Sequence, residues 1–319
     1  MDYYIGVDLG GTSIKTGIVD ENYKISGSGT VPTSLPKTPE EIGMLIKESV
    51  DLALKDAGRT MDEIKWAGIG IPGIVDAKNG VVGFASNFNF RDVKMAEISQ
   101  RLLGVPVYIE NDANAAIYGE MLNGSAKGCK NVVMLTLGTG VGGGVIINGS
   151  IYSGFNSQGA ELGHVGIFYG GEKCLCGHTG CIEMYCSATA LIKQTKRAME
   201  LAPESILWDM AKGSLDNVDG RIAFDAMRKG DKAAKSVVSQ YTDYLGYAVV
   251  NYINIFQPEM IVLGGGISYQ KDIILEPLRE YARKHALGYT PESHTKIECV
   301  SLGNDAGIIG AAFLGQSFS

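Results

Sequence analysis

The stretch Tyr3-Tyr-Ile-Gly-Val-Asp-Leu-Gly-Gly-Thr-Ser-Ile-Lys15 decides the fold, because its pattern returns later in the chain. It reads as an apolar strand, a glycine-threonine turn and a second strand. Leu137-Gly-Thr-Gly-Val-Gly-Gly-Gly144 repeats this arrangement after the apolar run 132–137. A repeat at roughly 130 residues predicts two similar domains rather than a solenoid, whose periods run about 20–50 residues. Each half would carry a sheet with helices on its faces, which predicts an α/β fold.

Glycine is the outlier of the composition. The chain has 43 glycines in 319 residues, and many fall in short runs after hydrophobic segments, as in Gly10-Gly11, 142–144 and 264–266. Glycine lets the backbone approach a ligand closely or adopt positive φ. Backbone N–H groups of such turns, with the hydroxyls of Thr12 and Thr139, are suited to phosphate oxygens. The alternative for any single turn is an ordinary tight hairpin.

Charge and hydropathy exclude two classes of partner. The net charge of -7 lacks the basic footprint that nucleic-acid binding needs. No apolar run approaches the roughly 18 residues of a membrane helix. The N-terminus lacks the basic and apolar regions of a signal peptide. We therefore expect a cytoplasmic protein without nucleic-acid or membrane partners.

Two acidic positions lie at the ends of expected strands, where α/β proteins place their ligands. Asp8 stands beside the first glycine turn, where Mg²⁺ would be needed between its carboxylate and a phosphate. The alternative is an aspartate that bonds its own turn. Asp112 lies in Glu110-Asn-Asp-Ala-Asn-Ala-Ala116, which follows the expected strand 105–109. It is suited to accept a proton from a hydroxyl that attacks a phosphate, or to cap the following helix, as is Asn111.

The segment Cys174-Leu-Cys-Gly-His-Thr-Gly-Cys181 holds three cysteines within eight residues, and His164 precedes it. One histidine and three thiolates form a closed tetrahedral set, which predicts a structural zinc site. The alternative is a group of free cysteines. His178 is a possible rival ligand, but it lies in a short loop between glycines and is expected to be exposed.

These motifs together resemble those of the ROK family of bacterial sugar kinases and sugar-responsive repressors. The matches follow the family's order: Asp8–Thr12 (first phosphate motif), 110–115 (catalytic segment), 137–144 (second phosphate motif), 174–183 (zinc signature), 263–268 (adenosine motif) and 303–310 (closing helix). The resemblance implies an actin-like (ribonuclease H-like) ATPase fold, with two similar lobes around a central cleft. It places the N-terminal lobe at 1–115, the C-terminal lobe at 116–304, and a C-terminal helix, 305–319, back on the first lobe.

The resemblance also implies roles for single residues, with Asp112 as the catalytic base. Sugar hydroxyls would be bound by Gly73, Asn87, Asn111, Asp112, Glu161, His164 and Glu183. ATP and Mg²⁺ would be held by Asp8, Gly10, Gly11, Thr12, Lys15, Gly138, Thr139, Gly140, Gly264, Gly265 and Gly266. A solvated lysine is the alternative for Lys15. A structural Zn²⁺ on His164, Cys174, Cys176 and Cys181 would brace Glu161 and Glu183.

The function implied is that of an ATP-dependent carbohydrate kinase, as a homodimer, acting on the 6-hydroxyl of a glucose-type unit. Phe90 stands where glucose kinases of the family carry tryptophan. It would keep an aromatic wall but lose an N–H donor, so the unit is either free glucose or the glucosyl part of a β-glucoside admitted by a wider, more apolar pocket. N-acetylmannosamine and fructose are further alternatives. A sugar-sensing repressor would need a helix-turn-helix domain before the first phosphate motif, which begins by residue 8. A zinc-binding scaffold would leave the two hairpins and the adenosine motif unexplained.

Overall fold

The computed structural model describes residues 1–317, which fall into two compact units. Unit 1 comprises Met1–Val132, Gly144–Ala160 and the chain from Ser301 onward. Unit 2 comprises Val133–Gly143 and Glu161–Val300. The lobe boundary between residues 115 and 116 stays a prediction.

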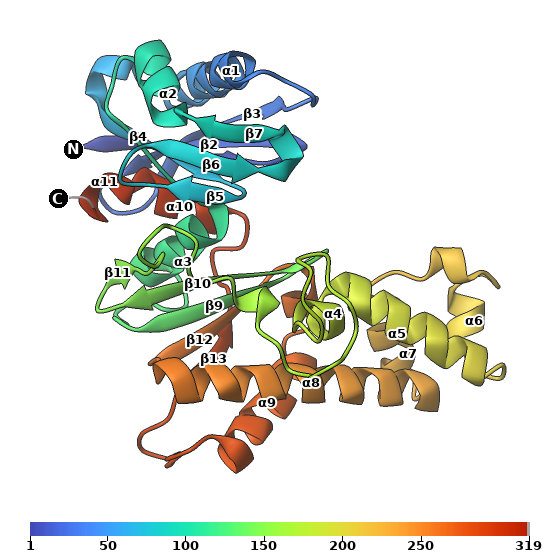
Figure 1. The fold of residues 1–319 in the computed structure, drawn as a ribbon. Helices are drawn as coiled ribbons and strands as arrows, with labels where there is room; N and C mark the ends of the chain where they lie inside the picture. Colours follow the sequence, from blue (N-terminus) through green and yellow to red (C-terminus); the bar gives the residue numbers. More distant parts are fainter. Residues whose placement is uncertain (318–319) are drawn as a thin grey trace. The chain divides into compact units, whose positions relative to one another are not determined.

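Unit 1 is built on a five-stranded sheet with the order β3-β2-β1-β4-β8 (Figure 1). β1 (Tyr3–Leu9), β2 (Ser13–Asp20) and β3 (Ile25–Pro32) form an antiparallel meander, as the repeat predicts. β4 (Ile64–Ile71) pairs parallel to β1, and β8 (Val107–Asn111) pairs parallel to β4. The carboxyl ends of these three parallel strands therefore meet at one edge of the sheet.

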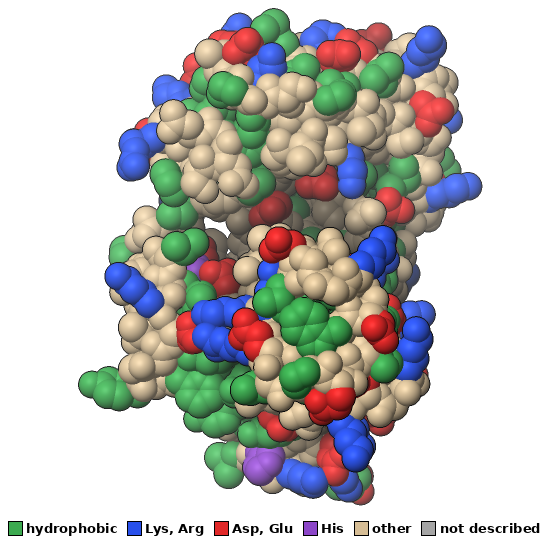
Figure 2. Space-filling model, turned by 90° about the vertical axis from the view of Figure 1, so that its right-hand side faces the viewer, with side chains coloured by type: hydrophobic (Ala, Val, Ile, Leu, Met, Phe, Trp, Pro, Cys, Tyr) green, Lys and Arg blue, Asp and Glu red, His purple; other side chains and the backbone are tan. Residues whose placement is uncertain are grey.

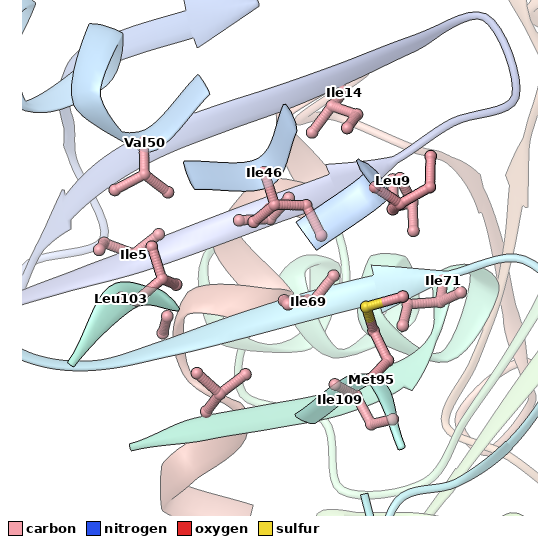
Figure 3. Close-up of a cluster of buried hydrophobic side chains, with 14 of the residues drawn as sticks. Ile5, Leu9, Ile14, Ile46, Val50, Ile69, Ile71, Met95, Leu103 and Ile109 are labelled. Carbon is pink, nitrogen blue, oxygen red and sulfur yellow. The ribbon is translucent and has the colours of Figure 1, made fainter. Parts of the chain in front are cut away.

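Helices cover both faces of this sheet. α1 (Pro39–Ala57) and α2 (Met95–Leu103) pack on one face, and Figure 3 shows the core between them and the strands. The labelled core side chains are Ile5, Leu9, Ile14, Ile46, Val50, Ile69, Ile71, Met95, Leu103 and Ile109. α3 (Asp112–Asn123) and α10 (Asp305–Ala312) pack together, and α10 also packs on β1 and β4.

α10 can approach the sheet closely because two positions on the strands are glycines. A Cβ on Gly6 of β1 would lie 1.9 Å from the Ile308 carbonyl oxygen, and one on Gly68 of β4 would lie 1.8 Å from that of Ala311. No real Cβ fits at such distances, so glycine is required at both positions. Short α11 (Leu314–Ser317) follows.

Unit 1 also carries a small antiparallel sheet of β5 (Ile74–Asp76), β6 (Val81–Ala85) and β7 (Phe90–Val93). It lies between β4 and α2 in the sequence, with the single-turn 3₁₀ helix Ser86–Phe88 before its last strand. The hydrophobic pattern does not predict this sheet.

The second large sheet has the order β11-β10-β9-β12-β13, which repeats the first sheet position by position. β9 (Val132–Leu137) and β10 (Val141–Ile147) replace the first hairpin, followed by β11 (Ser150–Ile151). β12 (Met260–Gly264) and β13 (Lys296–Cys299) are parallel, like β4 and β8. The predicted internal repeat is confirmed by this shared order.

Unit 2 adds a group of helices around α8 (Lys232–Phe256). Its partners are α4 (Glu183–Cys186), α5 (Ala188–Leu201), α7 (Ile222–Arg228) and α9 (Asp272–His285), with α6 (Leu207–Met210) against α7. No helix among residues 1–317 is both long and apolar enough to cross a membrane. Acidic and basic side chains are intermixed on the face shown in Figure 2 rather than gathered by sign.

Glu120 of α3 is a completely buried carboxylate that ties two loops to the helix. Its oxygens accept hydrogen bonds from the backbone and hydroxyl of Ser125 and from those of Ser301, and from Leu302 N. Ser301 and Leu302 follow β13 and lead into α10. The carboxylate therefore links the loop after α3 to the start of the connection between β13 and α10.

Glu120→Ala should lower the free energy of unfolding by about 3 kcal/mol or more, because several buried donors lose their acceptor. For a chain of this size, this corresponds to a fall in Tm of roughly 4 °C or more. Thermal unfolding followed by circular dichroism measures the change. Glu48→Ala, on the exposed side of α1, is the control and should stay within about 0.5 kcal/mol of the parent. An equal Tm for both variants would contradict the role of Glu120.

Candidate functional site

The first glycine turn joins β1 to β2 and is held by its own backbone. Gly10 N donates to Ser13 O at 3.0 Å, and Thr33 donates to Gly10 O at 2.7 Å and to Thr12 O at 3.0 Å. A Cβ on Gly10 would lie 2.8 Å from Ser13 O, whereas one on Gly11 would meet nothing within 4 Å. The turn is therefore tight inside and open outside, and its tip with exposed Thr12 is accessible to a ligand.

The second glycine turn, between β9 and β10, has similar geometry. Gly138 N donates to Gly140 O at 3.0 Å, and the Thr189 hydroxyl donates to Thr139 O at 2.8 Å. A Cβ on Gly138 would again meet open space. Gly265, at φ 81°, directly follows β12 and packs against this hairpin. A Cβ added there would lie 2.5 Å from Leu137 O. The second phosphate motif and the adenosine motif are therefore adjacent within unit 2.

The segment after β8 resolves which residue caps α3. Asn111 is the N-cap, and its Oδ1 accepts hydrogen bonds from Ala113 N at 2.9 Å and Asn114 N at 3.1 Å. Its Nδ2 donates to Gly73 O at 2.9 Å. Asp112 is thus the first helical residue rather than the cap, and its Oδ1 accepts from Ala113 N at 2.9 Å. Its second carboxylate oxygen is left for other chemistry.

Asp8 and Asp112 lie near each other within unit 1. Burial raises the pKa of Asp8, the negative charge of Asp112 raises it further, and Lys15 lowers it. Lys15 is the direct partner of Asp8 across the β1–β2 ladder. Burial also raises the pKa of Asp112, against hydrogen bonds that lower it. Two carboxylates beside an open glycine turn form a place suited to a hard divalent cation.

Gly73 precedes β5 and Asn87 follows β6, so both lie near the open end of the β5–β6 hairpin, where Ile74 pairs with Phe84. Gly73 has φ 112°, and a Cβ there would lie 2.2 Å from Phe84 O, so only glycine fits. Asn87 is exposed in the 3₁₀ turn Ser86–Phe88. The expected aromatic wall at Phe90 is wrong, because its side chain is 3% exposed and belongs to the core, with its ring 5.4 Å from that of Phe88.

The predicted zinc ligands come together in unit 2. Ligand atoms of His164, Cys174, Cys176 and Cys181 lie within 4.8 Å of one another. His164 Nδ1 is 3.6 Å from Cys174 Sγ, and the sulfurs of Cys176 and Cys181 are 3.7 Å apart. His178 is exposed and outside the cluster, as expected, with its Nδ1 accepting a hydrogen bond from Thr179 N.

Glu183 links this cluster to the second glycine turn. It follows Cys181 at the start of α4, and its Oε2 accepts a hydrogen bond from Val141 N at 3.0 Å. Its Oε1 lies 3.9 Å from Cys174 Sγ. Glu161, by contrast, is exposed at the start of the 3₁₀ turn 162–164, where its carbonyl accepts from His164 N.

Two buried tyrosines of α8 anchor the segment 162–186, which carries the cysteine–histidine cluster. The hydroxyl of Tyr241 donates to Cys186 O at 2.6 Å, and that of Tyr252 donates to Leu162 O. Both tyrosine side chains are fully buried. The segments that carry His164 and Glu183 are therefore fixed to a 25-residue helix as well as to each other.

Glu110 and Asn114 are positioning residues that the motif contains but that sequence reasoning left without a role. Glu110 Oε1 accepts from Asn111 N at 2.8 Å and from Asn114 Nδ2 at 3.1 Å. The side chains are 4% and 6% exposed. Glu110 lies in β8 and Asn114 in α3, so no periodic spacing in the sequence links the two side chains.

The predicted site residues thus form one group in each unit. Unit 1 holds Asp8, Gly10, Gly11, Thr12, Lys15, Gly73, Asn87, Asn111 and Asp112. Unit 2 holds Gly138, Thr139, Gly140, Glu161, His164, Cys174, Cys176, Cys181, Glu183, Gly264, Gly265 and Gly266.

Comparisons with known proteins agree on one family. The family model described as "ROK family" matches residues 4–317. The glucokinase of Thermotoga maritima is 39% identical over 311 residues, 97% of this chain and 95% of that protein. A ROK family glucokinase from Streptomyces griseus, solved with glucose and AMPPNP, has a TM-score of 0.80 and 35% identity, with 98% of each chain covered. A ROK hexokinase from Thermus thermophilus has a TM-score of 0.80 and 30% identity, over 99% of this chain and 100% of that one.

Proposed function

Because the chain belongs to the ROK family, we propose that it transfers the γ-phosphoryl group of ATP to the 6-hydroxyl of glucose. It is an ATP-dependent carbohydrate kinase with the actin-like ATPase fold. The observation that carries the residue assignment is Asp112, a largely buried carboxylate at the carboxyl end of β8 that does not serve as the helix cap.

In the proposed reaction, Asp112 accepts the proton of the sugar 6-hydroxyl as that oxygen attacks the γ-phosphorus. A new P–O bond forms to the sugar, the bond to the β–γ bridging oxygen breaks, and ADP leaves. Asn111 caps α3 and holds the loop to Gly73 O, so Asp112 projects from a fixed backbone. Such positioning supplies much of the rate enhancement in phosphoryl transfer.

The phosphates would be held by the two glycine turns. Gly11 and Gly138 offer open space where a side chain would stand, so backbone N–H groups there are accessible to phosphate oxygens. Thr12 and Thr139 add exposed hydroxyls. Asp8 would hold Mg²⁺, whose charge screens the phosphate oxygens, and Lys15 lies beside it in the ladder.

The cysteine–histidine cluster fits zinc by its distances. Bonds of about 2.3 Å to sulfur and about 2.0–2.1 Å to nitrogen, at tetrahedral angles, require S···S separations near 3.8 Å and S···N separations near 3.6 Å. The 3.7 Å between Cys176 and Cys181 and the 3.6 Å between Cys174 and His164 match these values. A bound Zn²⁺ would be structural, because four protein ligands leave no position for water.

Sugar recognition is proposed for both groups of residues. In unit 1 these are Gly73, Asn87, Asn111 and Asp112; in unit 2 they are Glu161, His164 and Glu183. Zinc would fix His164 and the cysteine segment that precedes Glu183. The Glu183 side chain in turn accepts a hydrogen bond from Val141 N, beside the second glycine turn. The zinc ion, the sugar-binding carboxylate of Glu183 and the second glycine turn would thus form one rigid unit. A cytoplasmic location and a homodimer stay predictions.

Glucose is favoured over the other sugars by the relatives and by Phe90. The buried position of Phe90 leaves no support for a widened, glycoside-binding wall there. We expect kcat/KM for glucose to exceed that for a β-glucoside, N-acetylmannosamine and fructose. A coupled ADP-release assay across these four sugars tests the proposal. A higher kcat/KM for any of the other three would overturn the choice of glucose.

The pH dependence of the reaction should reflect the buried base. Asp112 acts when ionised, and burial raises its pKa above the ordinary value of 3.8. The rate therefore falls as pH drops through this raised pKa, so the acid limb of kcat/KM should lie above 3.8. Asp112→Glu should shift this limb, whereas Asp62→Asn, at an exposed position, should not. An acid limb unmoved by Asp112→Glu would contradict the assignment.

A further inference from the structure

Unit 1 contains a cavity of about 560 Å³ that none of the proposed catalytic or sugar-binding residues lines. The end of β5, the β5–β6 turn, β11 and the loop after β11 form its walls, together with one residue each of β8 and α11. Its polar and aromatic lining includes Asn79, Glu110, Ser150, Phe155, Asn156 and Ser157. The volume falls in the range of small-molecule sites, about 300–1,000 Å³.

Glu110 presents an unsatisfied oxygen to this cavity. The residue is only 4% exposed, and its Oε1 accepts the hydrogen bonds from Asn111 N and Asn114 Nδ2. No donor atom within residues 1–317 bonds Oε2, and this oxygen is accessible to solvent. Oε2 is thus an acceptor without a protein partner, and a ligand that brings an O–H or N–H group can bind it in place of solvent.

The cavity lies on the other face of β8 from the core and from Asn111. Successive strand residues point to opposite faces of a sheet. Ile109 points into the core with α2, as Figure 3 shows, so Asn111 shares that face and Glu110 points away from it. The cavity is therefore separate from the side on which Asn111 bonds Gly73.

The chemistry of the lining favours a neutral, hydroxyl-rich ligand. Glu110 is an acceptor, Ser150 and Ser157 donate or accept, and Asn156 does both. Phe155, completely exposed at the rim, offers an apolar ring face. The charged residues of the lining are Asp76, Glu110 and Lys78, so the two carboxylates outweigh the one ammonium group and disfavour an anion. A divalent cation prefers several free carboxylates, and both oxygens of Asp76 already accept hydrogen bonds from Asn79.

We propose that this cavity is a second carbohydrate site, distinct from the site of phosphoryl transfer, which binds a neutral sugar through Glu110 and Phe155. The sugar hydroxyls donate to Glu110 Oε2 and exchange hydrogen bonds with the serine and asparagine side chains. The apolar face of the sugar ring lies on Phe155. Glu110 also holds Asn111 N, so the second site connects to the backbone of the proposed catalytic loop.

Equilibrium dialysis of the full-length protein with labelled D-glucose tests this proposal. We expect two glucose molecules per chain, one of which binds more weakly. Phe155→Ala should weaken the second site at least about threefold, since it removes the aromatic face. Glu110→Gln should weaken it about fivefold, because a charge-assisted hydrogen bond becomes a neutral one. Tyr169→Ala, which removes an equally exposed aromatic side chain outside the cavity, should leave both sites unchanged.

Initial rates of ADP release measured on the same preparations separate this proposal from the proposed kinase function. Phe155→Ala should retain the parent's kcat and its KM for glucose while the second site weakens. A single glucose site in the parent protein would overturn the proposal. So would a second site that keeps its affinity in both Phe155→Ala and Glu110→Gln.

Discussion

Asp112→Asn should lower kcat by about 10²–10⁴-fold while glucose binding persists. Asparagine has nearly the same shape and can still accept the hydrogen bond from Ala113 N, so α3 keeps its first turn. It cannot take up the proton of the attacking hydroxyl. The loss should therefore appear in kcat, with little change in the dissociation constant of the sugar.

The same substitution should not destabilise the protein, which distinguishes a lost base from a damaged fold. Burial raises the pKa of Asp112 in the folded protein, so the ionised carboxylate costs stability as pH rises through that value. Asparagine removes this cost, and Tm near pH 7 should be equal to or above that of the parent. Thermal unfolding and glucose titration calorimetry provide these two readouts. Asp62→Asn should leave kcat unchanged, and a kcat for Asp112→Asn within about threefold of the parent would refute the assignment.

The role of Asp112 illustrates what the sequence could and could not decide. Asn111 and Asp112 are both good N-cap residues, so their order in the segment left the cap open. The structure resolves this through Asn111, whose side chain accepts from two backbone N–H groups of α3. Which of two adjacent polar side chains turns back to the helix depends on the exit angle of β8, and this angle is a tertiary property.

The long elements were predictable because their patterns are strong. α1 spans residues 39–57, as its periodicity, Pro39 and the following glycine predict. The two glycine hairpins gave the repeat, and the shared strand order follows from it. By contrast, β5, β6 and β7 have only three to five residues each, and their pairing is stabilised by neighbours rather than by local pattern.

Phe90 shows the limit of transferring a residue's role by position. A substitution at an aromatic position suggested a changed pocket wall, but the side chain of Phe90 lies in the core. It pairs with Ala85 across the β6–β7 ladder, and this register directs its ring toward Phe88. The facing of a residue in a four-residue strand cannot be derived from the strand's own sequence.

The cysteine segment 174–181 offers a test in which loss of the metal can be separated from loss of packing. Cys174 and Cys181 are 2% and 0% exposed, so replacing either would also disturb the interior. Cys176 is exposed, and its substitution creates no internal cavity. Its sulfur is nevertheless one of the four proposed ligands. Cys176→Ser therefore changes the ligand set at the least structural cost.

We expect Cys176→Ser to reduce bound zinc from about one ion per chain to a small fraction, since a hydroxyl is a far poorer zinc ligand than a thiolate. Without the metal, the segments of His164 and Glu183 lose their shared ligand set and keep only hydrogen bonds, such as those of Val141 N, Tyr252 and the backbone pair Ile182–Val165. Tm should therefore fall and KM for glucose should rise at least about tenfold. Metal analysis, thermal unfolding and initial rates measure these effects. His178→Ala, in the same loop but outside the cluster, should retain the zinc and the parent's KM. An unchanged zinc content in Cys176→Ser, or its loss in His178→Ala, would show that the ligand set is different.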